Sequence, residues 1–520
     1  MAIQISPWWY AKPDGCIYLS IARSMAKGTQ LTALGNPHLV TTPGYPALIS
    51  PAFLTGDRPF LMLSILHWMM ATICIVGVYY WARRHSPSIA ILLTALAMVN
   101  AAVWLHYRRT IKEIAFMAVV IWTVNVMHAI LHDKHKSVLQ TAVLTVLAAL
   151  LVTLSAMIRY PGLVLAAGFG VVMLLATYRG RISWVRAATV TLMVSVPAST
   201  VVMWHIQHEE NMAQKNAEAT YLQSFQAAVR HIFHEPIFGT STDKPTVMQD
   251  DQPSEIPTSG KSICDNQLVE GLRLQISSLG QLTLPGMFKA NSGRGKWLTL
   301  NMIIYLIWLV FLLVGWWYLF GHKNDVFATS LPFYLILYII WPFDQGVRFL
   351  VVTAPLVTTC GWFGMRRLLP LKGVSMLSIG VILHLTVSTI YWLGTDAPRA
   401  YALHLEWPKV EQIAEEISGD PRPVAIVNID QKLQKKISYW VQRRLRLMLM
   451  LAIDRPVQEY KSQQQVSADI HWVVLPAGIT LDEKFQLKKH FGDYQLVSRK
   501  LSPNAPLAQT AQHRKSQAQR

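Results

Sequence analysis

The sequence is poor in charged residues and in cysteine, and both shortages narrow what the chain can be. Only 15% of its 520 residues are charged, whereas 52% are hydrophobic. One soluble domain cannot bury so much apolar surface, and the apolar residues come in blocks, so the composition indicates a polytopic membrane protein. The four cysteines include no CxxC pair, which excludes a zinc ribbon or a dithiol redox site.

Acidic residues are also scarce, with 29 Asp and Glu against 47 Lys and Arg and a formal net charge of +18. Such a balance can indicate binding to nucleic acid. Here, however, the basic residues are spread over short loops and the C-terminal region, with no basic stripe interleaved with aromatic residues. We therefore expect no nucleic-acid partner.

Ten apolar segments are long enough to cross a membrane, which takes about 20 residues per span. They lie near 60–81, 86–105, 113–132, 138–158, 161–178, 184–206, 298–320, 326–342, 347–364 and 373–394. Basic residues fall in alternate connecting loops, which marks those loops as cytoplasmic. The prediction is an α-helical polytopic protein of an inner cell membrane, with segments 1–59, 207–297 and 395–502 on the extracytoplasmic side.

The first outer segment raises a question of topology. Residues 1–59 carry Lys12, Arg23, Lys27 and Arg58, and no apolar span or signal peptide precedes them in the sequence as given. We therefore expect a first transmembrane helix upstream of Met1.

The first candidate site residue is an acid in the first outer segment. Asp14 is placed like the N-cap of a short surface helix. The apolar residues of that helix recur at spacings of three and four, namely Ile17, Tyr18, Ile21, Ala22 and Met25. The simpler interpretation of Asp14 is the cap alone.

Further ionisable residues stand at the predicted outer ends of spans. Glu113 opens the third span after a turn that contains Arg108 and Arg109, and Arg159 and Arg348 also lie at span ends. A structural alternative pairs Glu113 with Arg109 or Lys112, and each arginine could simply snorkel to the interface. Two arginines and two acids on one outer surface nevertheless resemble a site for an anionic headgroup, because guanidinium binds phosphate through two hydrogen bonds.

Several motifs then indicate a family. They are "PDGCIYLSIARSMAKG", "TTPGYPALI", the acid Glu113 after the first outer turn, "RYPGL" and "RFLVVTAPL". In this order the motifs resemble the membrane glycosyltransferases of the GT-C type, and more narrowly the group of protein mannosyltransferases, aminoarabinose transferases and RgtA/B/C/D-like proteins. The resemblance covers roughly residues 8–400.

The resemblance implies transfer of a sugar from a polyprenyl-phosphate donor to an extracytoplasmic lipid, glycan or protein, with inversion at the anomeric carbon. It matches Asp14 to the catalytic base and Glu113 to a second catalytic acid. Arg348 matches the arginine expected near the lipid phosphate, where Arg159, Arg108 or Arg109 would assist, and Tyr45 is a further substrate-binding candidate. Many relatives carry a second acid directly after the first, whereas this chain has Gly15.

The sequence requires no cofactor for this chemistry. A divalent metal held between Asp14 and Glu113 would be compatible with it. His231, His234 and Glu235 form only a weak metal-binding pattern, because the three ligand types are bunched without a distant partner. Cys16 and Cys264 both fall in predicted outer segments, where a disulfide could persist.

The outer segments differ in character. Residues 207–297 begin as a polar helical stretch and continue into a Pro-, Ser- and Thr-rich loop, which is a candidate lid or acceptor guide. The region 395–502 is expected to form a small α/β domain, followed by a disordered tail at 503–520. We predict strands over "RPVAIVNI", "ADIHWVVLP" and "YQLVSRKL", and helices over "KLQKKISYWVQRRLRLMLML" and "TLDEKFQLKKHF".

Two other functions remain open. A transporter or flippase of lipid-linked sugars would show internal repeats and polar or broken helices at mid-membrane, whereas the ionisable residues here gather at outer span ends. A non-catalytic membrane scaffold with the same fold would neither move nor consume a sugar lipid.

Overall fold

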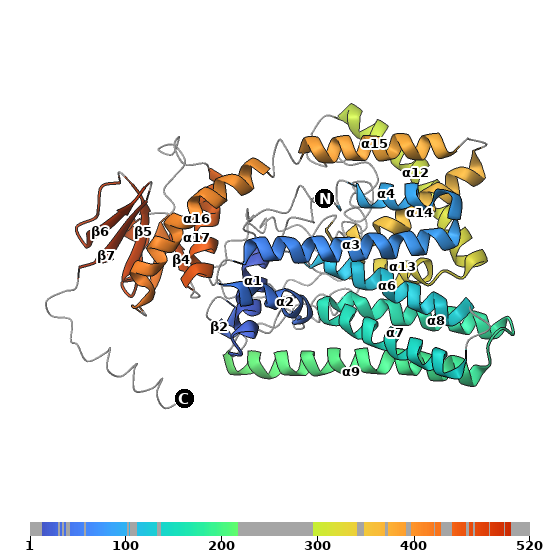
Figure 1. The fold of residues 1–520 in the computed structure, drawn as a ribbon. Helices are drawn as coiled ribbons and strands as arrows, with labels where there is room; N and C mark the ends of the chain where they lie inside the picture. The colour runs from blue at the N-terminus through green and yellow to red at the C-terminus, as the bar shows by residue number, and fades with distance from the viewer. Residues whose placement is uncertain are drawn as a thin grey trace, which may run out of the picture. The chain divides into compact units, whose positions relative to one another are not determined.

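The protein was analysed as a computed structural model (Figure 1). It describes residues 13–29, 32–33, 36–37, 42–56, 59–100, 103, 112–132, 137–216, 295–340, 348–369, 373–391, 397–420, 422–427, 439–453, 457–460, 463–477, 479–492 and 494–500. The chain divides into two units. One holds residues 1–7, 22–31 and 38–397, and the other holds residues 8–21, 32–37 and 398–520.

Each of the ten predicted spans falls on a helix of the first unit. The helices are α3 (Phe60–His85), α4 (Ala90–Met98), α6 (Glu113–His132), α7 (Val138–Ile158), α8 (Val164–Tyr178), α9 (Trp184–Asn216), α12 (Gly295–Lys323), α13 (Val326–Ile340), α14 (Ala354–Leu368) and α15 (Gly373–Tyr391). Within the described residues, 6 helical stretches are long and apolar enough to cross a membrane. The chain is therefore a multi-pass membrane protein, as its composition predicts.

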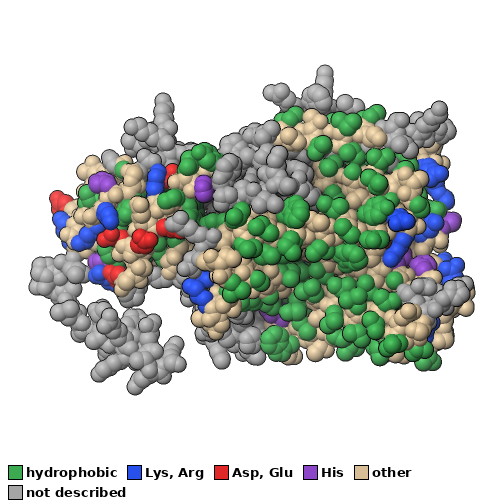
Figure 2. Space-filling view, in the orientation of Figure 1, with side chains coloured by type: hydrophobic (Ala, Val, Ile, Leu, Met, Phe, Trp, Pro, Cys, Tyr) green, Lys and Arg blue, Asp and Glu red, His purple; other side chains and the backbone are tan. Residues whose placement is uncertain are grey.

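Helix α6 lies at the centre of this bundle. It packs against α3 and α7, α7 packs in turn against α9, and α8 packs against α9 and α13 (Figure 1). The outward faces are apolar, and Leu139, Leu150 and Trp204 are each at least 60% exposed. Figure 2 shows hydrophobic side chains covering the face of the bundle that it draws, as expected of a surface that faces lipid.

Helices α12 and α14 approach each other through glycine. A Cβ atom built on Gly315 would lie 1.8 Å from the Cys360 carbonyl oxygen, and one built on Gly364 would lie 1.9 Å from the Phe311 carbonyl oxygen. Only glycine permits this backbone contact, which is how helices associate in a bilayer where burial of apolar surface does not drive them together.

The bundle has one basic end, defined by the basic residues at or next to the last turns of α3, α8, α12 and α14: Arg83, Arg84, Arg179, Lys323, Arg366 and Arg367. Lys and Arg side chains gather at that end in Figure 2. Helix α6 runs to the basic end from the opposite end, which we call the Glu113 end. Its 20 residues separate the two ends by about 30 Å.

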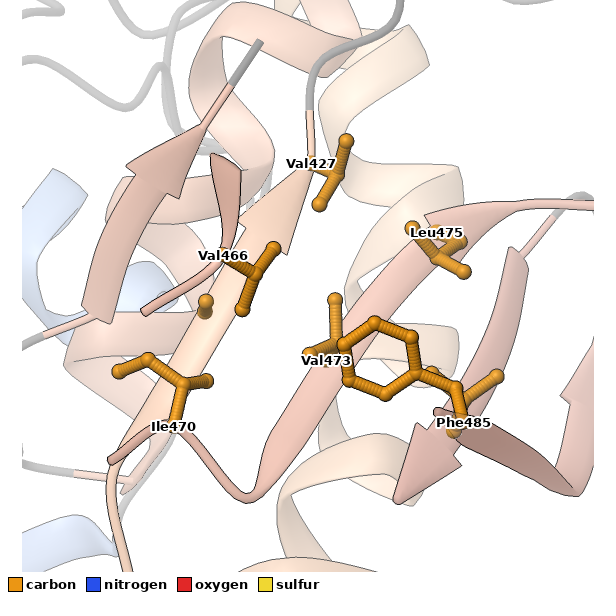
Figure 3. Close-up of a cluster of buried hydrophobic side chains, with 8 residues drawn as sticks. Val427, Val466, Ile470, Val473, Leu475 and Phe485 are labelled. Atoms are coloured by element: carbon orange, nitrogen blue, oxygen red, sulfur yellow. The ribbon is translucent and has the colours of Figure 1, made fainter. Parts of the chain in front are cut away.

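The second unit contains a five-stranded sheet in the order β4-β3-β5-β7-β6. Strands β3 (Val424–Val427), β4 (Val457–Tyr460) and β5 (Trp472–Pro476) are parallel, and β7 (Tyr494–Arg499) and β6 (Phe485–Phe491) join antiparallel. Helices α16 (Ala397–Ser418) and α17 (Tyr439–Ile453) accompany it. Figure 3 shows its apolar core, which includes Val427, Val466, Ile470, Val473, Leu475 and Phe485. The predicted α/β domain is present.

One predicted helix of this domain is wrong. The segment "TLDEKFQLKKHF" contributes strand β6, which pairs with β7 across a turn at Gly492, whose φ of 61° is in the left-handed region. A register shift between Leu487 and Lys489 breaks the alternation of β6, so its sequence lacks the two-residue period of a strand. Strand β4 and helix α16 were not predicted.

The predicted surface helix near the N-terminus also needs correction. Helix α1 (Pro13–Ala26) forms, but Leu19, Ser20, Ile21 and Ala22 are all buried. Four consecutive residues at 100° per residue point to every side of a helix, so α1 is covered all round and has no single apolar face. The helix begins at Pro13, which has a φ suited to a first turn, so Asp14 lies inside that turn rather than capping it.

Candidate functional site

At the Glu113 end, three predicted site residues come together. The Glu113 carboxylate accepts a hydrogen bond through Oε1 from Arg348 Nε, and Arg159 Nη1 lies 3.4 Å from the same oxygen. Glu113 is 1% exposed and Arg159 3%, while 21% of the Arg348 side chain remains exposed. We call these three residues the Glu113 cluster. Arg109, one of the expected partners of Glu113, lies outside the described residues.

Three chain reversals bring the cluster together. Glu113 is the first residue of α6, Arg159 is the C-cap of α7, and Arg348 precedes the 3-10 turn η6 (Leu350–Thr353). Arg159 has an extended backbone, with φ −154° and ψ 131°, and leads into the turn η4 (Tyr160–Leu163), where Pro161 cannot continue the helix. A charged residue at each reversal can face the interior without entering the middle of a span.

The "TTPGYP" motif packs against the end of α7, next to Arg159. Thr42 Oγ1 donates to the Ile158 carbonyl oxygen at 2.8 Å, which satisfies an otherwise orphaned C-terminal carbonyl of α7. A Cβ atom on Gly44 would lie 2.7 Å from the Met157 carbonyl, so glycine is required there. The motif therefore packs directly on the end of the helix that carries Arg159.

Aromatic residues pack against Arg159, and further aromatic residues hold Phe349, the residue after Arg348. The Arg159 guanidinium carbon lies 4.0 Å from the centroid of the Phe349 ring and 5.8 Å from that of Phe116. The Tyr334 hydroxyl on α13 donates to the Phe349 carbonyl oxygen at 2.7 Å, and Tyr338 packs on the Phe349 ring edge to face at 4.6 Å. These supporting residues were not predicted. The spacing of Tyr334 and Tyr338, four apart on one helix face, was the available signal.

The electrostatics of the cluster favour an anion. Two guanidinium groups surround one carboxylate, so the three side chains carry one net positive charge in a largely buried place. Arg348 is the member that a ligand can reach. A divalent cation on Glu113 Oε1 would meet both guanidinium groups, so we assign no step to the metal that the sequence leaves open.

An apolar pocket lies beside the cluster. It is lined by residues of α6, η4, α8, α13 and η6, and it shares Phe116 and Tyr334 with the residues around Arg159 and Phe349; the other lining residues are Val120, Pro161, Val164, Leu165, Phe327, Ser330, Leu331, Val352 and Thr353. Charged and apolar surfaces thus adjoin at the Glu113 end.

The remaining predicted site residues are placed as follows. Asp14 is half-buried in the first turn of α1 and belongs to the other unit. Tyr45 is fully buried, and its hydroxyl forms a 2.7 Å hydrogen bond with His67 Nε2 that joins α2 (Gly44–Ile49) to α3. Its contact with substrate stays a prediction. Outside the described residues lie Arg108, Arg109, His231, His234, Glu235, Cys264, most of the 207–297 segment and the 503–520 tail.

A second buried cluster was not predicted. At the basic end, Asp325 Oδ2 accepts hydrogen bonds from Trp81 Nε1 at 2.9 Å, His85 Nε2 at 2.9 Å and His128 Nε2 at 2.8 Å. Burial opposes ionisation of Asp325, but the hydrogen bonds from His128 and His85 outweigh it and hold the pKa of this carboxyl well below its usual value. Ionisable residues therefore gather at both ends of the bundle. Asp325 directly precedes the predicted span 326–342. An acid at the end of a span is the pattern that drew attention to Glu113, and the same pattern could have pointed to Asp325.

No family model and no curated protein matches the sequence. Among solved structures, ArnT from Cupriavidus metallidurans bound to undecaprenyl phosphate superposes with a TM-score of 0.52 at 10% identity, covering 97% of this chain and 96% of ArnT. The apo state of the same ArnT gives 0.50 at 11% identity over the same shares.

The fold is the GT-C fold. The likeness to ArnT extends over both the helices and the C-terminal region, and it agrees with the family predicted from the motifs. An oligosaccharyltransferase from Archaeoglobus fulgidus in the apo form superposes at 0.46 and 10% identity over 89% of this chain and 65% of that one, which is too distant to carry an argument. At these identities the comparison establishes the GT-C fold and leaves the chemistry to the residues.

Proposed function

We propose that this chain is a membrane glycosyltransferase that moves a sugar from a polyprenyl-phosphate donor to an extracytoplasmic acceptor. The single observation that carries the proposal is the Glu113 cluster, a partly exposed arginine backed by a buried carboxylate and a second arginine at the end of the bundle away from the basic loops. That the ArnT structure of the same fold is bound to undecaprenyl phosphate supports a donor of this chemical class.

The cluster would hold the departing phosphate. Transfer of a glycosyl group builds positive charge on the sugar ring and negative charge on the phosphate as the glycosidic bond breaks. Arg348 can offer guanidinium hydrogen bonds to the phosphate oxygens, while Glu113 and Arg159 keep its side chain in a fixed orientation. Because the group is already positioned and charged, it stabilises the leaving group without reorganisation and without a general acid.

The surface beside the cluster has the polarity of the other part of such a donor. A polyprenyl chain leaves its phosphate as a run of methyl-branched isoprene units, and the apolar lining places Phe116 and Val120 of α6 next to the charged cluster. Contact of isoprenoid surface with this lining would add to the affinity in proportion to the area removed from water.

Asp14 remains the proposed base, a role that rests on its motif. As a carboxylate it would take the proton of the acceptor nucleophile while that nucleophile attacks the anomeric carbon from the side opposite the phosphate, which inverts the configuration. A positioned base of this kind contributes about 10²–10⁴-fold in rate.

The proposal is tested by following donor consumption. The protein in lipid discs receives a panel of polyprenyl-phosphate sugars and a membrane extract as acceptor, and mass spectrometry measures the released polyprenyl phosphate. The wild type should release it, whereas Asp14→Asn and Arg348→Ala should not. Arg366→Ala, an exposed arginine in the last turn of α14, is the matched control and should behave as the wild type.

The other outcomes separate the competing functions. Transport of intact donor between leaflets without release would identify a flippase, and neither transport nor release would identify a scaffold. Full activity of Asp14→Asn beside an inactive Arg348→Ala would keep the transferase and move the base to another residue.

A further inference from the structure

We propose that His85, His128 and Asp325 bind one divalent transition-metal ion of the zinc class at the basic end of the bundle. The three ligand atoms come from three elements, the last turn of α3, the C-terminal part of α6 and the turn between α12 and α13, and all lie within 4.8 Å of one another. Among the residues that the structure describes, this group alone brings three such side chains together.

The donor set selects the kind of ion. Two imidazole nitrogens and one carboxylate oxygen suit zinc and similar transition metals, whereas calcium and magnesium prefer oxygen ligands throughout. Among the described residues, the Arg84 guanidinium makes a hydrogen bond to the Asn125 carbonyl oxygen at 3.0 Å and none to this carboxylate. Oδ2 of the carboxylate is hydrogen-bonded to the two histidines and to the indole of Trp81.

Asp325 Oδ2 accepts more hydrogen bonds than one carboxylate oxygen ordinarily does. Three N–H groups at 2.8 to 2.9 Å converge on Oδ2, although an ionised carboxylate oxygen offers about two lone-pair directions. A metal ion removes this conflict, because each Nε2 then presents a lone pair instead of a proton. Ligand atoms around zinc lie about 3.3 Å apart. Each imidazole would therefore move about 0.5 Å away from Oδ2, and the two Nε2 atoms, which lie within 4.8 Å of each other, would have to come to about 3.3 Å.

Neighbouring groups already donate hydrogen bonds to Asp325, as the groups around the ligands of a metal site do. The Ala328 backbone N–H donates to Asp325 Oδ1 at 2.7 Å, which leaves Oδ2 directed at the histidines, and the Trp81 N–H donates to Oδ2. Such outer hydrogen bonds orient metal ligands and tune their affinity. The side chains of His85, His128 and Asp325 are at most 4% exposed, so the ion would sit in a closed site with water as its fourth ligand.

The site would clamp the bundle rather than take part in transfer. It joins α3, α6 and the turn before α13. His128 follows Glu113 by 15 residues on α6, which places the site about 22 Å from the Glu113 cluster, so it neither rests on the proposed function nor falls with it. A ligand that binds only the folded state raises stability by mass action.

Zinc binding by the full chain in detergent tests the site. His231 and His234 are first replaced by glutamine, because they could bind zinc elsewhere. After removal of metal with a chelator and of the chelator by gel filtration, Zn²⁺ is titrated and retained metal is counted by mass spectrometry. We expect about one Zn²⁺ per chain, little binding of Mg²⁺ and a higher unfolding temperature with zinc.

Matched variants decide the assignment. His85→Gln and His128→Gln should lose the bound ion and its thermal shift, whereas His322→Gln, an exposed histidine three residues before Asp325, should keep both. Trp81→Phe retains every ligand and should bind zinc about 10–100-fold more weakly. If the parent chain retains no zinc, or His128→Gln retains it unchanged, the site does not exist. Should the ligand variants fail to fold, unchanged affinity in Trp81→Phe overturns the proposal.

Discussion

The two ends of helix α6 hold buried charge in opposite arrangements. At its start, one carboxylate is enclosed by two arginines, one of which stays partly exposed. Near its end, one carboxylate is enclosed by two histidines and an indole, and none of the charged atoms is open to the surroundings. The first arrangement has positive charge to spare and an accessible arginine, which fits an anionic ligand. The second has a closed set of metal-type donors.

The largest expected effect is on stability, when the buried carboxylate at the Glu113 end is removed. Glu113→Ala leaves the Arg159 guanidinium buried without its carboxylate, which should lower the free energy of unfolding by about 3–5 kcal/mol. Unfolding in mixed detergent micelles measures the change. Glu416→Ala removes the exposed pair with Lys489 and should change stability by less than about 1 kcal/mol. Equal effects of the two variants would mean that the buried pair contributes nothing.

The next effect concerns activity. Arg348→Ala should lower kcat/KM for the polyprenyl-phosphate donor by about 10²–10³-fold, the usual loss when one preorganised donor to a developing anion is removed. Stability should change less than in Glu113→Ala, because the Arg348 side chain is partly exposed. A loss of the same size in Arg366→Ala would contradict a specific role at the Glu113 end.

A smaller effect separates charge from geometry. Arg348→Lys keeps the positive charge but loses the planar fork, so we expect KM for the donor to rise about tenfold or more with a lesser change in kcat. Initial rates over a range of donor concentrations give the two constants. An unchanged KM would show that the cluster attracts the phosphate only by its charge.

The smallest effect belongs to the basic end. Arg179 donates to the Asn324 side chain and to the Gly321 carbonyl, so it ties the end of α8 to the turn that carries Asp325. Arg179→Ala should lower stability by about 1 kcal/mol and leave donor consumption unchanged. Thermal unfolding and the transfer assay measure both quantities. A loss of transfer in Arg179→Ala would show that the basic end and the Glu113 end of the bundle are coupled.

Much of the site could be predicted from the sequence because ionisable residues are few at the ends of spans away from the basic loops. Glu113, Arg159 and Arg348 each stand out against apolar neighbours, and the structure brings all three together. Their pairing could not be predicted, since 235 residues separate Glu113 from Arg348. From the sequence, the obvious candidate partners of Glu113 were its neighbours Arg109 and Lys112, and nothing singled out the distant Arg159 and Arg348 as its partners.

The errors have physical causes as well. Strand β6 resembles a helix because its irregular register removes the strand period, and helix α1 resembles a surface helix because its buried Ser20 and Ser24 look polar. The Asp325 cluster escaped notice because its two histidines lie 43 residues apart and far from Asp325, and a single histidine shows no metal-binding pattern by itself.

The sequence by itself determined the membrane class, the positions of the spans and the residues with ionisable groups at their ends, because about 20 apolar residues in a row have no other stable environment than lipid or a protein core. Only the tertiary structure decided which charges meet. A span's ends are fixed by its own composition, whereas the partner of a buried charge depends on which helices pack together. That packing is set by local fits such as the glycine contacts of α12 with α14 and the "TTPGYP" turn on α7, which no single segment contains.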